Sequence, residues 1–202
     1  MAQNKHLEHL EDELINYGYG GYVASRDLIQ NFITELGGRP SGRVTVTTKW
    51  DGAPAVVCGI DPESKQFFVG TKSVFNKKEP KINFTEADID KNHGEIPDLA
   101  KKLKYCLKYF PELKIKGIVQ GDLLFTDEDV VTKNIDGERY YTATPNTLTY
   151  AWPVDSNLGK AVNTAKIGAV FHTYYSGTGP INTLNAGTND WGTSGFQGFC
   201  QI

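Results

Sequence analysis

Lys49-Trp50-Asp51-Gly52-Ala53 lies between two apolar runs, Val44-Thr45-Val46 and Ala55-Val56-Val57-Cys58. Both runs are rich in valine, so both are predicted to be strands that the pentapeptide connects. Alternate side chains share a face in an extended chain, so its lysine and aspartate point one way and its tryptophan the other. The glycine lets a ligand or a second backbone segment approach closely. The fold predicted around this pentapeptide therefore starts from a β-sheet.

Further strands are expected on the C-terminal side of the pentapeptide. The predicted strands are Val44–Thr48, Ala55–Ile60, Phe67–Gly70, Ile115–Phe125, Val130–Ile135, Tyr140–Thr144 and Ile167–Tyr174. Turn residues Asp61-Pro62-Glu63-Ser64 separate the second strand from the third, and Asp136-Gly137 separates the fifth from the sixth. Antiparallel hairpins are therefore predicted at both places.

Helical periodicity is expected in three other segments. Apolar residues recur at helical spacing over His6–Tyr17, from a cap at Ser25 to Leu36, and over Asp98–Tyr109. Because helices come first and hairpin-rich strands follow, we expect an α+β fold with antiparallel sheets and flanking helices. The expected parts are an N-terminal helical segment over residues 1–42, a core over residues 43–175 and a Gly-rich loop or tail over residues 176–202.

The composition is that of an ordinary globular protein. The chain has 202 residues, of which 39% are hydrophobic and 22% charged, so it can bury a core. A formal net charge of -3 argues against a protein that grips nucleic acid over its whole surface, while a local basic groove stays compatible with it. The three cysteines are far apart and lack CxxC spacing, which disfavours a zinc site. No run approaches the roughly 18 apolar residues of a membrane span, so we expect a cytoplasmic protein.

A lysine followed by a carboxylate and a glycine suits covalent attack on a nucleotide. A lysine amine is protonated in neutral water, so it must be desolvated or placed near cations before it attacks phosphorus. Asp51 is placed to hold the sugar or the lysine in register. Nucleotide transfer also needs cations for the phosphates, acids for a metal or the ribose, and an apolar slot for the base. Downstream candidates are Lys72, Asp122 and Phe171, whereas His172 is expected to be structural.

The order of these segments resembles the covalent nucleotidyltransferase superfamily, which contains ATP-dependent DNA ligases, RNA ligases and mRNA capping enzymes. Lys49–Gly52 is similar to its first motif, which carries the nucleotidylated lysine. Thr71-Lys72-Ser73 is similar to the following Ser-Arg element, and Gln120–Leu123 to the third motif. Ala169–Thr173 is similar to the strand whose aromatic residue commonly lines the base pocket.

A closer resemblance covers most of the chain and points to uncharacterised ligase-like proteins of tailed phages. The segments that carry it are His6–Asp12, Lys49–Pro62, Thr71–Asn76, Gln120-Gly121-Asp122 and Pro145-Asn146-Thr147. This resemblance brings no established substrate. It implies that the protein works in the host cytoplasm if a phage encodes it.

The superfamily resemblance implies a ligase-type nucleotidyltransferase (ATP-grasp-like) domain that uses ATP and Mg²⁺. Lys49 would form a lysyl-AMP, and AMP would then pass to a 5'-phosphate end of DNA or RNA. Asp122 would bind the metal. The residues implied to contact the nucleotide are Thr48, Trp50, Asp51, Gly52, Lys72, Asp122 and Phe171. DNA against RNA and ATP against GTP stay open, and no membrane partner is implied.

Departures from the superfamily pattern leave alternatives open. Pro54 stands where DNA ligases usually have an arginine, and Asp122 where the family usually has a glutamate. After Phe171, no Glu-Gly or Lys-x-Lys segment resembles the fourth and fifth motifs. The chain is then truncated at its C-terminus, or builds the remaining site differently, or is inactive. The alternative functions are a catalytically degenerate protein that binds nucleotide or nucleic acid, and a structural phage protein that retains the fold.

Overall fold

The structure of the chain is a computed structural model that describes residues 10–38, 49–187 and 199–201. The described residues fall into two compact units, which divide between Lys49 and Trp50. This division lies later in the chain than the boundary expected at residue 42. The strand expected at Val44–Thr48 lies outside the described residues. Each unit has its own packing and is described by itself.

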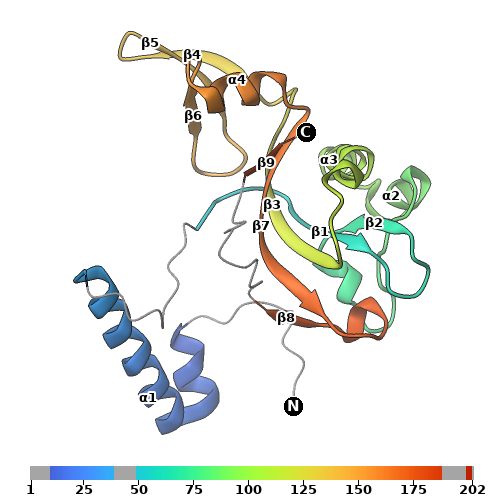
Figure 1. Cartoon of the computed structure of the whole chain (residues 1–202). Helices are drawn as coiled ribbons and strands as arrows, with labels where there is room; N and C mark the ends of the chain where they lie inside the picture. Colours follow the sequence, from blue (N-terminus) through green and yellow to red (C-terminus); the bar gives the residue numbers. More distant parts are fainter. Residues whose placement is uncertain (1–9, 39–48, 188–198, 202) are drawn as a thin grey trace. The chain divides into compact units, whose positions relative to one another are not determined.

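Helix α1 (Leu10–Leu36) makes up most of the described N-terminal unit and is bent into two helices (Figure 1). The bend lies at Gly18, whose φ of 54° and ψ of -127° suit glycine far better than other residues. The two halves meet at Gly21, where an added Cβ would lie 1.8 Å from the backbone oxygen of Glu13. The absence of a side chain at Gly21 therefore lets the two halves pack closely.

The sequence analysis predicted Ser25 as the cap of a second helix, and the structure corrects this. Ser25 is buried inside the second half of α1, and its hydroxyl donates to the backbone oxygen of Leu10 at 3.4 Å. A small polar residue suits this close crossing, so packing between the two halves outweighs its local preference for a cap.

The second unit contains the other elements (Figure 1). Its strands are β1 (Ala55–Ile60), β2 (Phe67–Gly70), β3 (Ile118–Thr126), β4 (Val131–Ile135), β5 (Glu138–Ala143), β6 (Tyr150–Pro153), β7 (Ile167–Ser176), β8 (Asn185–Gly187) and β9 (Phe199–Gln201). Its α-helices are α2 (Glu86–His93), α3 (Pro97–Tyr109) and α4 (Asn157–Thr164). Its 3-10 helices are η1 (Lys72–Phe75), η2 (Phe110–Leu113) and η3 (Ile181–Thr183). The fold is α+β, as predicted.

The larger of two antiparallel sheets has the order β2-β1-β3-β7-β8, and β9 also pairs with β7. In this sheet Ala55 of β1 lies opposite Asp122 of β3, and Asp122 lies opposite Val170 of β7. The strand that follows the pentapeptide therefore runs beside the strand that carries Asp122.

Helices α2 and α3 cover one face of the larger sheet (Figure 1). Leu103 and Cys106 of α3 are fully buried there against Val56, Val119 and Phe171 of the sheet. These apolar residues recur at helical spacing along α3, so one side of the helix faces the sheet. A fully buried leucine contributes about 1.5–3 kcal/mol to stability, which makes this face the main core.

The opposite face of the larger sheet is covered in two places. Near β2, the short helices η1 and η3 contribute Val74 and Ile181 to a second buried cluster. Near the other end of β3, the smaller sheet (β4-β5-β6) and α4 form a third cluster, in which Trp152 packs edge-on against Phe125 at 5.5 Å between ring centroids. Polar side chains of β3 and β7 face the same side as these two clusters.

The described strands after the pentapeptide largely follow the sequence prediction. The β1–β2 and β4–β5 hairpins, β3, β7 and α3 form where apolar periodicity predicted them. The prediction missed α2 and α4, which have eight residues each and are too short for apolar periodicity to identify with ease. The capping box of Thr85 and Asp88 at α2 was a usable signal for the first of these helices.

The prediction of a loop or tail after residue 176 is wrong for the segments Ile181–Thr183, Asn185–Gly187 and Phe199–Gln201, while residues 188–198 lie outside the described residues. Ile181 and Leu184 are 2% and 1% exposed, and Asn185–Gly187 and Phe199–Gln201 pair with β7. These short strands have no apolar period of their own. They form because the edge of β7 offers unpaired backbone groups, which is a long-range effect.

Candidate functional site

Gly52 is the residue at which the pentapeptide meets β3. A Cβ added to Gly52 would lie 2.6 Å from the Cβ of Asp122 and 2.6 Å from the backbone oxygen of Leu123. Backbone pairing continues this contact, because the amide of Ala53 donates to Leu123 at 2.9 Å and the amide of Leu123 donates to Pro54 at 3.1 Å. Two segments that are distant in sequence are thereby held in direct contact at Asp122.

Asp51 fastens the pentapeptide to the loop between β5 and β6. Its carboxylate accepts hydrogen bonds from the Asn146 side-chain amide at 2.8 Å, from the Thr147 hydroxyl at 2.7 Å and from the Thr147 amide at 3.2 Å. The hydroxyl of Tyr150 accepts from the backbone amide of Asp51 at 2.7 Å. The hydrogen bonds from the Thr147 hydroxyl and then from Asn146 lower the pKa of Asp51. Donors of the protein therefore occupy this carboxylate.

Trp50 belongs to the packing around the smaller sheet. Its ring lies 5.5 Å from that of Tyr150 at 34° between planes, and it packs on the third buried cluster. Together with the Asp51 hydrogen bonds, this contact holds the pentapeptide against the loop at residues 144–149. The sequence analysis assigned Trp50 to the nucleotide, and in the structure its ring is engaged with Tyr150.

A β-bulge sets the direction of His172. Gln120 pairs with Thr173 and Gly121 pairs with Phe171, so His172 has no partner residue on β3. A bulge of this kind bends the strand and re-aims a side chain, and bulges are common beside functional sites.

Asp122 and His172 face each other as a result. His172 Nε2 lies 3.8 Å from Asp122 Oδ2, too far for a hydrogen bond, and His172 Nδ1 lies 2.8 Å from the Thr173 hydroxyl. The side chains of Asp122 and His172 are 20% and 30% exposed. Among the described residues no donor reaches the Asp122 carboxylate within hydrogen-bond distance, so it is available to a ligand.

Other polar groups lie on the same face of the sheet. Gln120 and Thr173 are both buried, and the hydroxyl of Tyr175 donates to the side-chain oxygen of Gln120 at 2.7 Å. Burial raises the pKa of Tyr175 to about 12, so this hydroxyl stays a donor at neutral pH. These polar side chains, together with Asp122 and His172, lie between the two buried apolar clusters of this face.

Phe171 does not take the position that the sequence analysis assigned to it. It pairs with Gly121, so it points away from the face that Asp122 shares with Val170. Its ring is 3% exposed and packs edge-on against Phe110 at 5.5 Å between centroids. On that face Val170 lies opposite Asp122, and the polar side chain of β7 that lies beside Asp122 is that of His172. The assignment of Phe171 came from the superfamily resemblance, and nothing in the sequence indicates the bulge that brings His172 there.

The remaining predicted residues are two lysines and a threonine. Lys49 is exposed and directly precedes Trp50, and Thr48 lies outside the described residues. Lys72 is exposed at the start of η1, where Thr71 accepts a hydrogen bond from the Ser73 amide at 3.3 Å. Lys72 has no ion-pair partner in the part of the chain that the structure describes. Its ammonium is therefore free to meet an anion.

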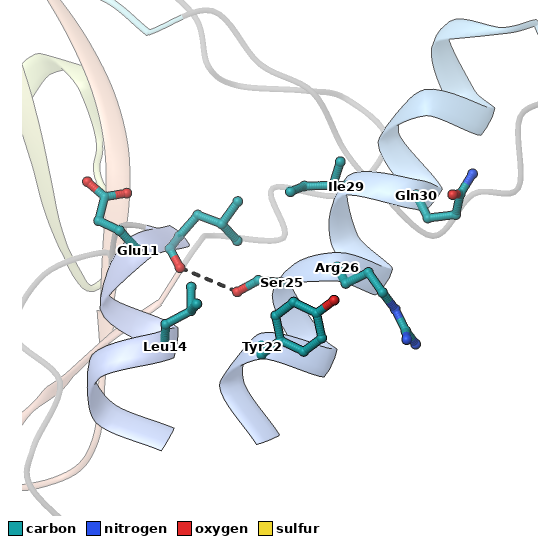
Figure 2. A pocket seen from close by; sticks show the side chains of 8 residues that line it. Glu11, Leu14, Tyr22, Ser25, Arg26, Ile29 and Gln30 are labelled. Atoms are coloured by element: carbon teal, nitrogen blue, oxygen red, sulfur yellow. Dashed lines mark hydrogen bonds between the residues drawn. The ribbon is translucent and has the colours of Figure 1, made fainter. Parts of the chain in front are cut away.

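A separate groove of about 510 Å³ lies in the helical unit (Figure 2). It is lined by Leu10, Glu11, Leu14, Tyr22, Ser25, Arg26, Ile29 and Gln30. Its walls are mostly apolar, and the guanidinium of Arg26 is already paired with Asp27 at 2.7 Å. The groove offers no set of groups that would perform chemistry.

No three His, Cys, Asp or Glu side chains among the described residues come together as a metal cage. An ion at Asp122 would therefore take most of its ligands from water or from a substrate. No helix in the described ranges is long and apolar enough to cross a membrane.

Residues 4–197 match a protein family described as a family of unknown function, DUF6267. No curated protein and no solved structure matches the chain. Because the match spans nearly all of the 202 residues, the chain belongs to the DUF6267 family.

Proposed function

We propose that this protein is an ATP-dependent nucleotidyltransferase of the polynucleotide ligase type, with Lys49 as the nucleophile. The observation that carries the proposal is the contact of Gly52 with Asp122. It joins the segment similar to the first superfamily motif to the segment similar to the third, and His172 lies beside them. Lys49 stands three residues before Gly52, and three residues of chain span at most about 11 Å.

In the proposed first step, the uncharged amine of Lys49 attacks the α-phosphorus of ATP. The new N–P bond forms as the bond between that phosphorus and the bridging oxygen of pyrophosphate breaks. Pyrophosphate leaves with the electron pair, and the proton of the lysine passes to solvent. The product is a lysyl-AMP joined through a phosphoramidate.

In the proposed second step, an oxygen of a 5'-phosphate on DNA or RNA attacks the same phosphorus. The N–P bond breaks, and the amine of Lys49 leaves and takes up a proton. The AMP is then carried by the 5'-phosphate end through a new pyrophosphate bond. Exposed Lys72 is suited to hold the negative charge of the phosphates during either step.

Two further features support the proposal. The open carboxylate of Asp122 suits Mg²⁺, which proteins usually hold through one or two carboxylates while water and phosphate oxygens complete the shell. The ion would supply charge neutralisation at the phosphates. The hydrogen bonds of Asp51 fix the backbone that follows Lys49, and such positioning supplies much of the rate in group transfer.

Covalent labelling tests the proposal directly. Purified protein is incubated with ATP or GTP and Mg²⁺, and its intact mass is measured. We expect the mass of one nucleotidyl group, which is a nucleoside monophosphate less one water, to be added, and peptide mapping should place it on Lys49. Lys49→Ala should show no adduct, whereas Lys116→Ala, which removes another exposed lysine, should be labelled as the parent is. Equal labelling of Lys49→Ala would show that the nucleophile is assigned wrongly.

A second candidate function is nucleotide or nucleic-acid binding without turnover. The lack of segments after Phe171 that resemble the fourth and fifth superfamily motifs favours it. In that case the mass experiment gives no adduct in any variant, while ATP still binds with an affinity that Asp122→Asn changes. Titration calorimetry with ATP separates this candidate from a structural protein that does not bind nucleotide.

A further inference from the structure

We propose that Asp122 and His172 together form a binding site for a divalent transition-metal ion, with Mn²⁺ preferred over Mg²⁺. This goes beyond the proposed function, which needs only a carboxylate and Mg²⁺. The site would consist of Asp122 Oδ2 and His172 Nε2, with water in the other positions when no substrate is bound. For the role of the ion in nucleotide transfer, the inference rests on the function proposed above.

The distance between the two side chains fits an ion placed between them. At 3.8 Å, Nε2 and Oδ2 are too far apart to bond to each other. Neighbouring ligands on an octahedral ion with bonds of about 2.1 Å lie about 3 Å apart. Closing the gap takes about 0.8 Å, and both side chains are partly exposed at 30% and 20%, so rotation about their own bonds can supply it.

The surroundings of His172 match those of a metal-binding histidine. Such histidines usually donate their second ring N–H to an oxygen, which fixes the ring and leaves the other nitrogen for the metal. His172 Nδ1 lies 2.8 Å from the Thr173 hydroxyl, which is buried and held in the strand. If Nδ1 carries the proton, Nε2 presents its lone pair toward Asp122. The bulge makes this orientation possible, because it lets the side chains of His172 and Thr173 lie on the same face of the sheet.

The pair of ligands selects the kind of ion. Mn²⁺ shares with Mg²⁺ a preference for carboxylate and water ligands, but as a first-row transition-metal ion it accepts an imidazole nitrogen more readily than Mg²⁺, which prefers oxygen ligands alone. A site with one carboxylate and one imidazole should therefore hold Mn²⁺ more tightly than Mg²⁺. Since the described residues contain no third protein ligand nearby, the remaining positions are open to water or phosphate oxygens.

Nuclear magnetic resonance with Mn²⁺ alone locates such a site even when binding is weak, because the paramagnetic ion broadens nearby signals. The experiment uses the full chain labelled with ¹⁵N and no nucleotide. We expect the amide signals of Gly52, Asp122 and His172 to broaden first. His172→Ala should need at least about tenfold more Mn²⁺ for equal broadening. Mg²⁺ should compete poorly with Mn²⁺ in the parent and better in that variant.

Three controls keep the test decisive. Asp155→Asn removes an exposed carboxylate elsewhere and should leave the broadening unchanged. Lys49→Ala should also leave it unchanged, so failure of the lysine assignment is separate from failure of the metal site. If His172→Ala does not fold, His172→Asn keeps a polar partner for Thr173 without the imidazole and should show the same loss. Broadening centred on the acidic turn at Asp127–Asp129, or equal broadening in the histidine variants, would overturn the inference.

Discussion

Asp51 accepts three hydrogen bonds from the loop at Asn146 and Thr147, whereas Asp122 accepts none from the described residues. The two carboxylates lie in neighbouring segments, since Gly52 follows one in the chain and contacts the other in space. Both belonged to the nucleotide site predicted from the sequence. Their hydrogen bonding nevertheless differs, because protein donors fill the acceptor positions of Asp51 and no described donor reaches Asp122.

The difference bears on the roles that we propose for the two carboxylates. A carboxylate whose acceptors are filled by protein donors gains little from a ligand and is costly to remove, because its donors are then left unpaired. A partly buried carboxylate without donors loses hydration on folding and gains nothing in return until a cation or a donor arrives. The hydrogen bonds of Asp51 thus hold the backbone, whereas no described donor reaches the Asp122 carboxylate, as the proposed metal site requires.

The largest effect is expected from Gly52→Ala, which breaks the contact between the two regions. The new Cβ would need space now taken by Asp122 and by the backbone of Leu123, both at 2.6 Å. Overpacking against backbone should lower the free energy of unfolding by roughly 2–3 kcal/mol. Labelling at Lys49 should be lost as well. Urea unfolding and intact-mass analysis measure the two effects.

Gly20→Ala is the matched control for that substitution. No atom lies within 4 Å of an added Cβ at Gly20, which sits inside α1. Alanine should there stabilise the helix by about 0.5–1 kcal/mol and leave labelling unchanged. An unfolding free energy of Gly52→Ala equal to that of the parent would show that the two regions are not in close contact.

Asp122→Asn should come next in effect and should act on chemistry alone. Because no described donor depends on the carboxylate, stability should stay within about 0.5 kcal/mol of the parent. The rate of labelling should fall by about 100-fold, since charge stabilisation of phosphate and metal is lost. A time course of the mass adduct together with thermal unfolding checks this. A large loss of stability with normal labelling would reverse the roles assigned to Asp51 and Asp122.

Asp51→Asn should mainly loosen the local structure and should have a smaller effect on labelling than Asp122→Asn. Asparagine keeps one acceptor oxygen, but the hydrogen bonds from Asn146 and Thr147 to a charged group are lost. Hydrogen exchange of the Thr147 amide should accelerate by about tenfold, whereas that of the buried Val119 amide in β3 should change little. Labelling should fall less than in Asp122→Asn. Unchanged exchange at Thr147 would show that the hydrogen bonds to Asp51 do not hold this loop in place.

The smallest effect is expected when acid protonates Asp51 and weakens its hydrogen bonds with Asn146 and Thr147. The pKa of Asp51 is lowered in the folded chain, first by the Thr147 hydroxyl and then by Asn146. A lowered pKa contributes stability that is present above the unfolded value of about 3.9 and is lost as pH falls through the folded value. The difference in stability between the parent and Asp51→Asn should therefore be constant from about pH 7 to 5 and disappear only in stronger acid. Unfolding curves at several pH values measure it.

The sequence predicted the central strands because their signals are local. Apolar periodicity and turn residues were enough for the β1–β2 hairpin, for β3 and for α3, and the pattern of lysine, aspartate and glycine was enough to nominate the pentapeptide. The short strands β8 and β9 could not be predicted in this way. They form by pairing with the otherwise unpaired edge of β7, and the local sequence around each short strand does not indicate that β7 is its partner.

For the candidate site, the sequence by itself identified Lys49, Asp51, Gly52 and Asp122 as candidate nucleotide-site residues. Only the tertiary structure decided how their roles divide. Hydrogen bonds from residues 146 and 147 make Asp51 a structural anchor of the pentapeptide. A bulge in β7 places His172 beside Asp122, while Phe171 packs in the core on the other face. The physical reason is that a residue type fixes which bonds a side chain can make, whereas strand register and the folding of distant segments fix which partners reach it.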